Sequence, residues 1–194
     1  MGFVMSSISK RDQIIEAADQ LFYQQGFEHT SFAHIAEKVK ISRGNFYYHF
    51  KSKDEILDAV INLRLANTQA LLEQWVSEGE TPTDRIRSFI NILIMNRAKI
   101  KRFGCPVGTL TMELTKLDHP AQEDASKLFS LFRAWLKGQF KQLGYKKNAD
   151  DLAMHLLARS QGVAALASAF NDEKFIKQEV NDLYLWLDQY TAAP

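Results

Sequence analysis

Two very short helical stretches between residues 31 and 50 constrain the fold of this chain more than any other feature. The first follows a Thr30–Ser31 cap, and its apolar residues have the spacing of one buried stripe: Phe32, Ile35, Ala36 and Val39. The second begins at Ser42, a helix-capping residue type, and ends near Phe50. Helices of about two turns bury too little surface to be stable alone, so each must pack against a neighbour. Their short link, KIS, makes the pair a predicted helix-turn-helix.

The rest of the chain also has the apolar spacing of helices. Apolar residues recur at three and four positions rather than two, and only nine glycines and four prolines interrupt them, so we expect an all-α fold. One helix precedes the pair, from about Ser9 to Gly26, and a long helix follows it from Ser52 to Gly79. The others are expected over 81–103, 106–117, 118–144, 148–170 and 172–190, which gives about nine helices.

The composition excludes several classes of protein. The single cysteine, Cys105, excludes an intramolecular disulfide framework and a multi-cysteine zinc cluster, and it fits a reducing compartment such as the cytoplasm. The longest apolar runs, such as FINILIM, are far shorter than the roughly 18 to 20 residues of a membrane-spanning helix. The histidines lack metal-ligand spacing, and the chain has no glycine-rich phosphate loop. We therefore expect a cytoplasmic protein with no membrane segment, no metal and no cofactor.

Basic charge is concentrated around the second short helix. The net charge of +1 does not by itself indicate a nucleic-acid partner. Five basic residues and no acidic residue nevertheless lie between positions 38 and 53, and both flanking segments are rich in acidic residues. Such a patch is either an ordinary solvated helix face or the footprint of a nucleic acid.

The order of side chains on this helix favours the nucleic acid. At 100° per residue, Phe46 and Phe50 share one face and are expected to hold the helix against its neighbours. The opposite face and its flanks carry small, amide, phenol and imidazole groups: Gly44, Asn45, Tyr48, Tyr47 and His49. Both faces of a two-turn helix cannot be core, so at least one tyrosine must be exposed. Side chains of this kind suit insertion into the major groove of DNA.

The segment GFEHTSFAHIAEKVKISRGNFYYHFKSKDEIL, residues 26–57, resembles the DNA-binding segment of TetR-type bacterial transcriptional repressors. The resemblance implies a three-helix DNA-binding domain over residues 1–52 whose base contacts come from Arg43, Gly44 and Asn45. It implies phosphate contacts from Ser31, Ser42, Tyr47, Tyr48, His49 and Lys53. Lys40 departs from the family, which often has glycine there. This residue either strains the backbone, if its φ is positive, or adds a contact to the DNA backbone.

The resemblance also implies that residues 53–194 bind a small molecule and form a homodimer through the last two helices. The segment LLARSQGVAALASAF, residues 156–170, mixes large and small apolar residues, which permit close helix packing either between protomers or within one. A dimer places two recognition helices on half-sites about one DNA turn apart, so we expect a palindromic double-stranded operator. A small-molecule effector that prefers another spacing would weaken operator binding.

The effector cavity is expected among large apolar residues, the cysteine and one arginine: Trp75, Phe89, Met95, Phe103, Cys105, Met112, Phe132, Trp135 and Arg159. Each apolar residue is equally well explained as ordinary core. Arg159 and Gln161 interrupt an apolar helix, where both are candidates to orient a ligand carbonyl or carboxylate. The alternative for Arg159 is a salt bridge. Cys105 precedes a helix near three cations, where a thiol tends toward the nucleophilic thiolate, or it is a small buried residue.

We therefore expect a ligand-responsive transcriptional regulator with no catalytic residues, a repressor released from its operator by a small apolar or electrophilic molecule. The alternative is an all-helical enzyme, for example a hydrolase that pairs Cys105 with His119 or His155, or a helical ligand carrier.

Overall fold

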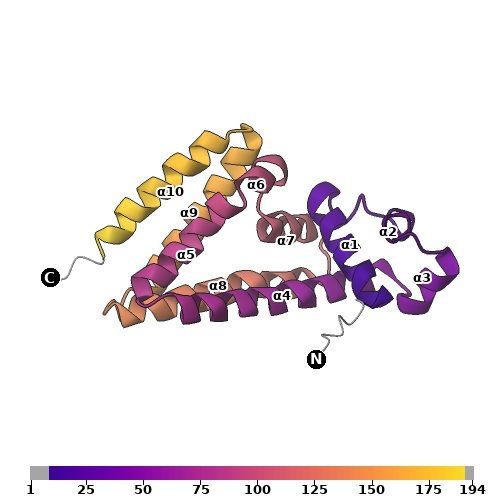
Figure 1. Ribbon diagram of the computed structural model, residues 1–194, viewed down its shortest axis with the longest axis horizontal. Coiled ribbons are helices and arrows are strands. Elements are labelled where there is room, and N and C mark those ends of the chain that lie inside the picture. Colours follow the sequence, from indigo (N-terminus) through magenta and orange to yellow (C-terminus); the bar gives the residue numbers. More distant parts are fainter. Residues whose placement is uncertain (1–8, 191–194) are drawn as a thin grey trace, which may run out of the picture.

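The computed structural model describes residues 9–190, which form ten helices and no strand (Figure 1). They are α1 (Lys10–Gln25), α2 (Phe32–Val39), α3 (Arg43–His49), α4 (Lys53–Glu78), α5 (Pro82–Met95), α6 (Arg97–Phe103), α7 (Pro106–Lys116), α8 (Gln122–Gln142), α9 (Ala149–Ala169) and α10 (Glu173–Asp188). The all-α prediction is confirmed, with the helix-turn-helix at the N-terminal end. No helix among the described residues has the length and hydropathy to cross a bilayer.

Side-chain caps explain why the helices begin where the sequence predicted. Ser9, Ser31, Ser42, Ser52 and Thr81 each accept a hydrogen bond from the backbone N–H three residues later. These bonds satisfy N–H groups that have no partner within the helix.

The helix expected over residues 81–103 is divided at Asn96. This residue has φ −104° and ψ 8°, and its side-chain amide donates to the carbonyl of Ile92 at 3.0 Å. Asparagine competes with the helical backbone in this way, so α5 ends and α6 starts in a new direction.

The α1–α3 helices pack around what we call the N-terminal core. Its residues from these helices and the turn after α1 are Ile14, Ile15, Ala17, Ala18, Phe22, Phe27, Ile35, Ala36, Phe46 and Phe50. The core continues into the start of α4, and it includes Leu110 and Leu114 of α7 and two alanines at the start of α8. The division at residues 52 and 53 stays a prediction, and buried packing extends across it.

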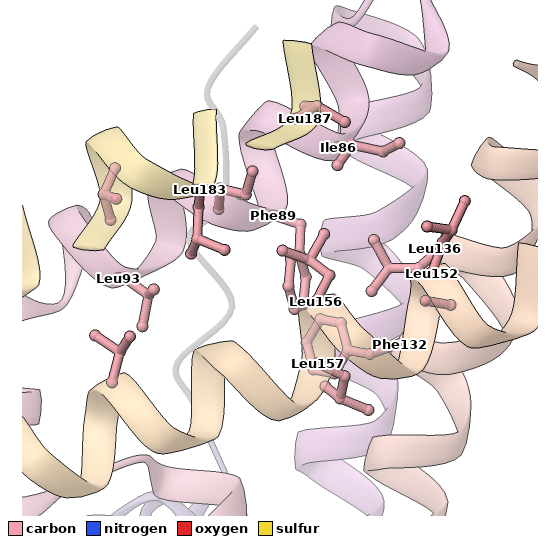
Figure 2. Packing of buried hydrophobic residues seen from close by; sticks show 14 of the residues in the cluster. Ile86, Phe89, Leu93, Phe132, Leu136, Leu152, Leu156, Leu157, Leu183 and Leu187 are labelled. Carbon is pink, nitrogen blue, oxygen red and sulfur yellow. The ribbon is translucent and has the colours of Figure 1, made fainter. Parts of the chain in front are cut away.

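The later part of α4 and the helices α5, α6, α8, α9 and α10 form a second body. Its buried residues, which we call the C-terminal core, include Leu72, Phe89, Phe132, Leu156 and Leu183. In Figure 1, α4 and α8 run side by side along one edge, and α5, α9 and α10 form the other. Figure 2 shows Phe89 of α5 and Phe132 of α8 meeting Leu156 and Leu157 of α9. The two phenylalanine rings are 5.5 Å apart and edge to face, a favourable arrangement of aromatic quadrupoles.

Candidate DNA-binding face and effector cavity

Two phenylalanines hold α3 against the N-terminal core, as predicted. Phe46 and Phe50 are each 1% exposed. The Phe46 ring lies 5.0 Å from that of Phe32 on α2, and the Arg11 guanidinium of α1 lies 4.9 Å from the centre of the Phe50 ring. The buried side of α3 is therefore fixed by both preceding helices.

The opposite side of α3 faces solvent. Gly44 and Asn45 are exposed, and the exposed fractions of Tyr47 and Tyr48 are 48% and 77%. The prediction that at least one tyrosine is exposed is confirmed for both. A methyl group built on Gly44 would meet no atom within 4 Å, so the protein itself does not require glycine there.

Polar groups surround this exposed side. His49 is partly buried, with its ring edge to face with Tyr48 at 5.2 Å. Ser31 and Ser42 cap α2 and α3, and each accepts a backbone N–H at 3.3 Å. Their hydroxyl protons remain available for a phosphate oxygen. Arg43 begins α3, and its side chain lies outside the part of the structure that is described.

Lys53 differs from the expectation of a phosphate contact. Its ammonium donates to the carbonyls of Phe27 and Glu28, at 3.1 and 3.4 Å, and lies 4.1 Å from the centre of the Phe27 ring. Two of the three ammonium N–H groups are therefore used within the protein, and the phosphate contact stays a prediction.

A cavity of about 120 Å³ lies between α5, α6, the start of α7, α8 and α9. It is lined by Phe89, Ile92, Leu93, Asn96, Ile100, Cys105, Pro106, Val107, Phe129, Phe132, Leu157, Ser160, Gln161 and Ala164. Three of the nine predicted effector residues, Phe89, Cys105 and Phe132, are in this wall.

The other six do not line this cavity, and one of them, Trp135, lines a separate hollow between α4 and α8. Met95 and Met112 point to solvent with exposed fractions of 75% and 58%, because each occupies the outer side of its helix. Phe103 packs edge to face on Tyr23 at 5.5 Å.

The remaining three are occupied by other contacts. Trp75 and Trp135 pack against each other between α4 and α8, with ring centres 5.5 Å apart. Arg159 forms a salt bridge to Glu179 of α10 at 2.6 Å, which was the alternative explanation for it.

The sequence reasoning singled out Gln161 on α9 and missed the residues that share its face. Leu157, Ser160, Gln161 and Ala164 have the spacing of a single helix face, and all line the cavity. Two of the four, Ser160 and Ala164, are small, which leaves space beside the helix.

The cavity is apolar with few polar groups. No charged side chain is among its lining residues. Asn96 and Ser160 donate to backbone carbonyls of their own helices, at 3.0 and 2.7 Å. The Gln161 amide has no hydrogen-bond partner among the described residues, so it is the group best placed to bind a ligand.

The histidines do not pair with Cys105. His119 accepts a hydrogen bond from the Ala121 backbone at 3.1 Å, and its Nε2 lies 3.5 Å from Asp54. His155 stacks on Trp186 with ring centres 4.8 Å apart. Within residues 9–190, no hydrogen bond joins either histidine to Cys105, so the predicted hydrolase pairing has no geometric support.

The α9 and α10 helices expose several large apolar side chains, which we call together the apolar strip. Leu166, Phe170 and Leu185 have exposed fractions of 47%, 76% and 64%. Gly162 and Ala165 are exposed beside them. Ala164 and Ala167 face their own core instead, so these two small residues serve packing within the chain, one of the two alternatives considered above.

Two family models match the chain. Residues 14–60 match the model described as bacterial regulatory proteins, tetR family. Residues 82–180 match the model described as transcriptional regulator LmrA/YxaF-like, C-terminal domain.

Curated relatives are named as transcriptional regulators. An uncharacterised helix-turn-helix regulator in the lacX 3′ region of Lactococcus lactis is 34% identical over 122 residues, which are 62% of each chain. YuxN of Bacillus subtilis, also uncharacterised, is 30% identical over 118 residues, 61% of this chain and 38% of YuxN. The chain thus spans less than two thirds of these relatives.

A solved structure matches almost the whole fold. A TetR transcriptional regulator from Legionella pneumophila has a TM-score of 0.81 and 26% sequence identity, over 95% of this chain and 98% of the other. None of these names supports an enzyme or a carrier.

Proposed function

Because this chain belongs to the TetR family of bacterial regulatory proteins, we propose that it is a dimeric repressor released from a palindromic operator by a small, uncharged effector. The proposal places it in the cytoplasm with the chromosome. The observation that most supports a DNA-binding repressor is the packing of α3. Phe46 and Phe50 hold this helix against the protein, and Asn45 and Tyr48 are exposed on its other side.

The exposed groups of α3 match the chemistry of DNA recognition. A carboxamide such as Asn45 can form two hydrogen bonds with adenine in the major groove, and hydroxyl groups of Tyr47 and Tyr48 can bind phosphates on its walls. Gly44 has space around it, so the DNA backbone or a base edge can approach α3 closely.

Two copies of α3 are needed, and the apolar strip of α9 and α10 supports a dimer. Large apolar side chains that are more than half exposed, such as Phe170 and Leu185, indicate a surface that another protein covers. Exposed Gly162 and Ala165 allow a helix of a second copy to approach. A four-helix arrangement of α9 and α10 from two protomers would bury this strip.

The cavity supports a small and uncharged effector. An engineered protein cavity of about 150 Å³ binds benzene, so a cavity of 120 Å³ suits a molecule of about one ring. A charged ligand would lose its hydration without gaining an opposite charge in the wall. Gln161 can bind one carbonyl or hydroxyl group of such a molecule.

A second property of the wall favours electrophilic effectors. Cys105 precedes Pro106 at the start of α7, and both line the cavity. Its thiolate can add to the β-carbon of an α,β-unsaturated carbonyl compound, and the α-carbon then takes a proton, so no group leaves. Such an adduct would hold the cavity in its occupied state.

The proposal is tested by selecting bound DNA from a random pool with the full chain. We expect a palindrome whose half-sites lie about one turn apart, bound by a dimer. The bound DNA is then challenged with acetophenone, a one-ring carbonyl compound, and with benzoquinone, an electrophile of similar size.

Release by either compound supports the proposed effector class, and release by benzoquinone alone identifies the electrophilic route. A chain that enriches no sequence, or whose Asn45→Ala and Tyr48→Ala variants enrich the same sequence with equal affinity, contradicts the assignment of α3.

A further inference from the structure

The helix α7 lies between the effector cavity and the helix-turn-helix. Figure 1 shows it beside α1, between the N-terminal helices and the second body. At its start, Cys105, Pro106 and Val107 line the cavity. Further along, Leu110 and Leu114 are part of the N-terminal core. One helix of 11 residues therefore contacts both sites.

The start of α7 is bonded to α1. The Tyr23 hydroxyl donates to the carbonyl of Gly104 at 2.8 Å, and Nη1 of Arg64 donates to the carbonyl of Pro106 at 2.6 Å. Nε of the same buried Arg64 lies 2.5 Å from Asp19 of α1. Burial, with a smaller contribution from Cys105, raises the pKa of Tyr23 to about 12. The wall of the cavity at the start of α7 is thus joined by hydrogen bonds to α1, directly through Tyr23 and indirectly through Arg64 of α4.

The far end of α7 holds the turn between α1 and α2. The two carboxylate oxygens of Glu113 accept the backbone N–H groups of Phe27 and Glu28, each at 2.9 Å. Lys53 binds the carbonyls of the same two residues. The Phe27–Glu28 turn is therefore held by hydrogen bonds from both sides.

Gly26 makes this approach possible. Its φ is 91°, and a Cβ built on it would lie 2.8 Å from Oε1 of Glu113. Any other residue would be strained and would push the carboxylate away. The Gly26 carbonyl accepts from the Thr30 hydroxyl at 2.6 Å, immediately before Ser31 caps α2. The turn that Glu113 holds therefore leads directly into α2.

We propose that Glu113 is the positioning residue through which α7 couples occupancy of the cavity to the orientation of the helix-turn-helix. Occupancy displaces the start of α7, the helix moves as a unit because the close-packed interior does not compress, and Glu113 carries the Phe27–Glu28 turn with it. Charge-assisted bonds to two successive N–H groups make the turn follow. This inference rests on the proposed function, because it concerns the response of operator binding.

A double-mutant cycle tests the coupling without knowledge of the natural effector. Ala164→Phe fills the cavity, and Glu113→Gln keeps the shape of the side chain but leaves one acceptor oxygen for two N–H groups. Operator affinity is measured by fluorescence anisotropy on the selected DNA for the wild type, both single variants and the double variant.

We expect Ala164→Phe to weaken operator binding by a factor within about 5 to 150, the usual range of allosteric coupling. In the Glu113→Gln background the same substitution should weaken binding by less than about threefold. Glu37→Gln is the matched control: it removes the same charge from exposed α2, and the full effect of Ala164→Phe should persist. If Glu113 has only a structural role, Glu113→Gln should change the operator affinity by the same factor with and without Ala164→Phe. The weakening caused by Ala164→Phe would then be the same in both backgrounds.

A second variant covers the case in which Ala164→Phe does not fold. Gly108→Ala adds a methyl group 2.5 Å from Oε1 of Gln161, a flexible side-chain end that can move into the cavity. Alanine also stabilises the helix relative to glycine, so this variant should fold. The inference is overturned if filling the cavity weakens operator binding equally in the wild-type and Glu113→Gln backgrounds. It is also overturned if neither Ala164→Phe nor Gly108→Ala weakens operator binding. In both cases the proposed repressor function stands.

Hydrogen exchange provides a readout that needs no DNA. Filling the cavity should accelerate exchange of the Phe27 and Glu28 amides, because their bonds to Glu113 are strained. If the chain selects no DNA, the proposed function fails, and unchanged exchange at these amides would separately overturn the coupling.

Discussion

Replacement of Lys40 by glycine should stabilise the protein. Lys40 ends α2 with φ 56° and ψ 51°, the left-handed conformation, in which a residue with a Cβ loses about 1–2 kcal/mol. Its side chain is exposed and forms no hydrogen bond or ion pair within the described residues, so little is lost by removing it. Glycine also makes the unfolded chain more flexible, which costs about 0.4–1 kcal/mol.

The net effect of Lys40→Gly should be a gain of about 0.5–1 kcal/mol in the free energy of unfolding. For a chain of this length that gain raises Tm by about 1–4 °C. Lys40→Ala is the matched control, because it removes the same ammonium but keeps a Cβ in the strained conformation. Its stability should remain within about 0.5 kcal/mol of the wild type. Urea unfolding at one fixed dimer concentration measures both variants.

The same two variants test whether Lys40 contacts DNA. If its ammonium binds a phosphate, both should reduce the slope of log affinity against log salt by about 0.9 per protomer. If Lys40→Gly is no more stable than Lys40→Ala, the strain assigned to this turn is absent. An unchanged salt slope in both variants would leave strain relief as the only effect of the glycine.

Three further outcomes are expected. Asn45→Ala should weaken binding to the selected operator by about 1–3 kcal/mol, with relaxed preference at one base pair and an unchanged Tm, because the side chain is exposed; an altered Tm would show a structural role instead. Cys105→Ser should abolish release of DNA by benzoquinone and retain release by acetophenone, and retention of both responses would exclude covalent sensing. The folded pKa of Tyr23, about 12, lies above its ordinary value of 10.0, so its stabilising contribution is complete below pH 10 and is lost as the pH rises from 10 to 12. Urea midpoints between pH 9 and 11 should therefore fall less steeply for Tyr23→Phe than for the wild type, and parallel curves would contradict this.

Much of the fold could be predicted because its signals are local. A serine or threonine followed by a 3.6-residue apolar period is sufficient to start a helix, and the caps at Ser9, Ser42 and Thr81 lie where this pattern placed them. The outward face of α3 followed from the same geometry, since Phe46 and Phe50 are four residues apart.

The cavity could be predicted only in part, because it depends on how helices rotate against one another. Met95 and Phe89 are both large and apolar on α5, yet one is exposed and the other buried. The contacts at the ends of α7 were also invisible in the sequence, because Glu113 lies 86 residues from Phe27 along the chain. Nothing local to Lys53 indicated that its ammonium would bind the Phe27 carbonyl.

The participation of α7 in the N-terminal core limits how this protein can be engineered. Leu110 and Leu114 complete the packing of α1 and Phe27, so a fragment ending at residue 52 would leave apolar surface open to water. A chimeric regulator could be built by exchanging the DNA-binding part between relatives. Here a transplant should carry its own α7, or a compatible one, because the exchangeable unit is discontinuous in the sequence.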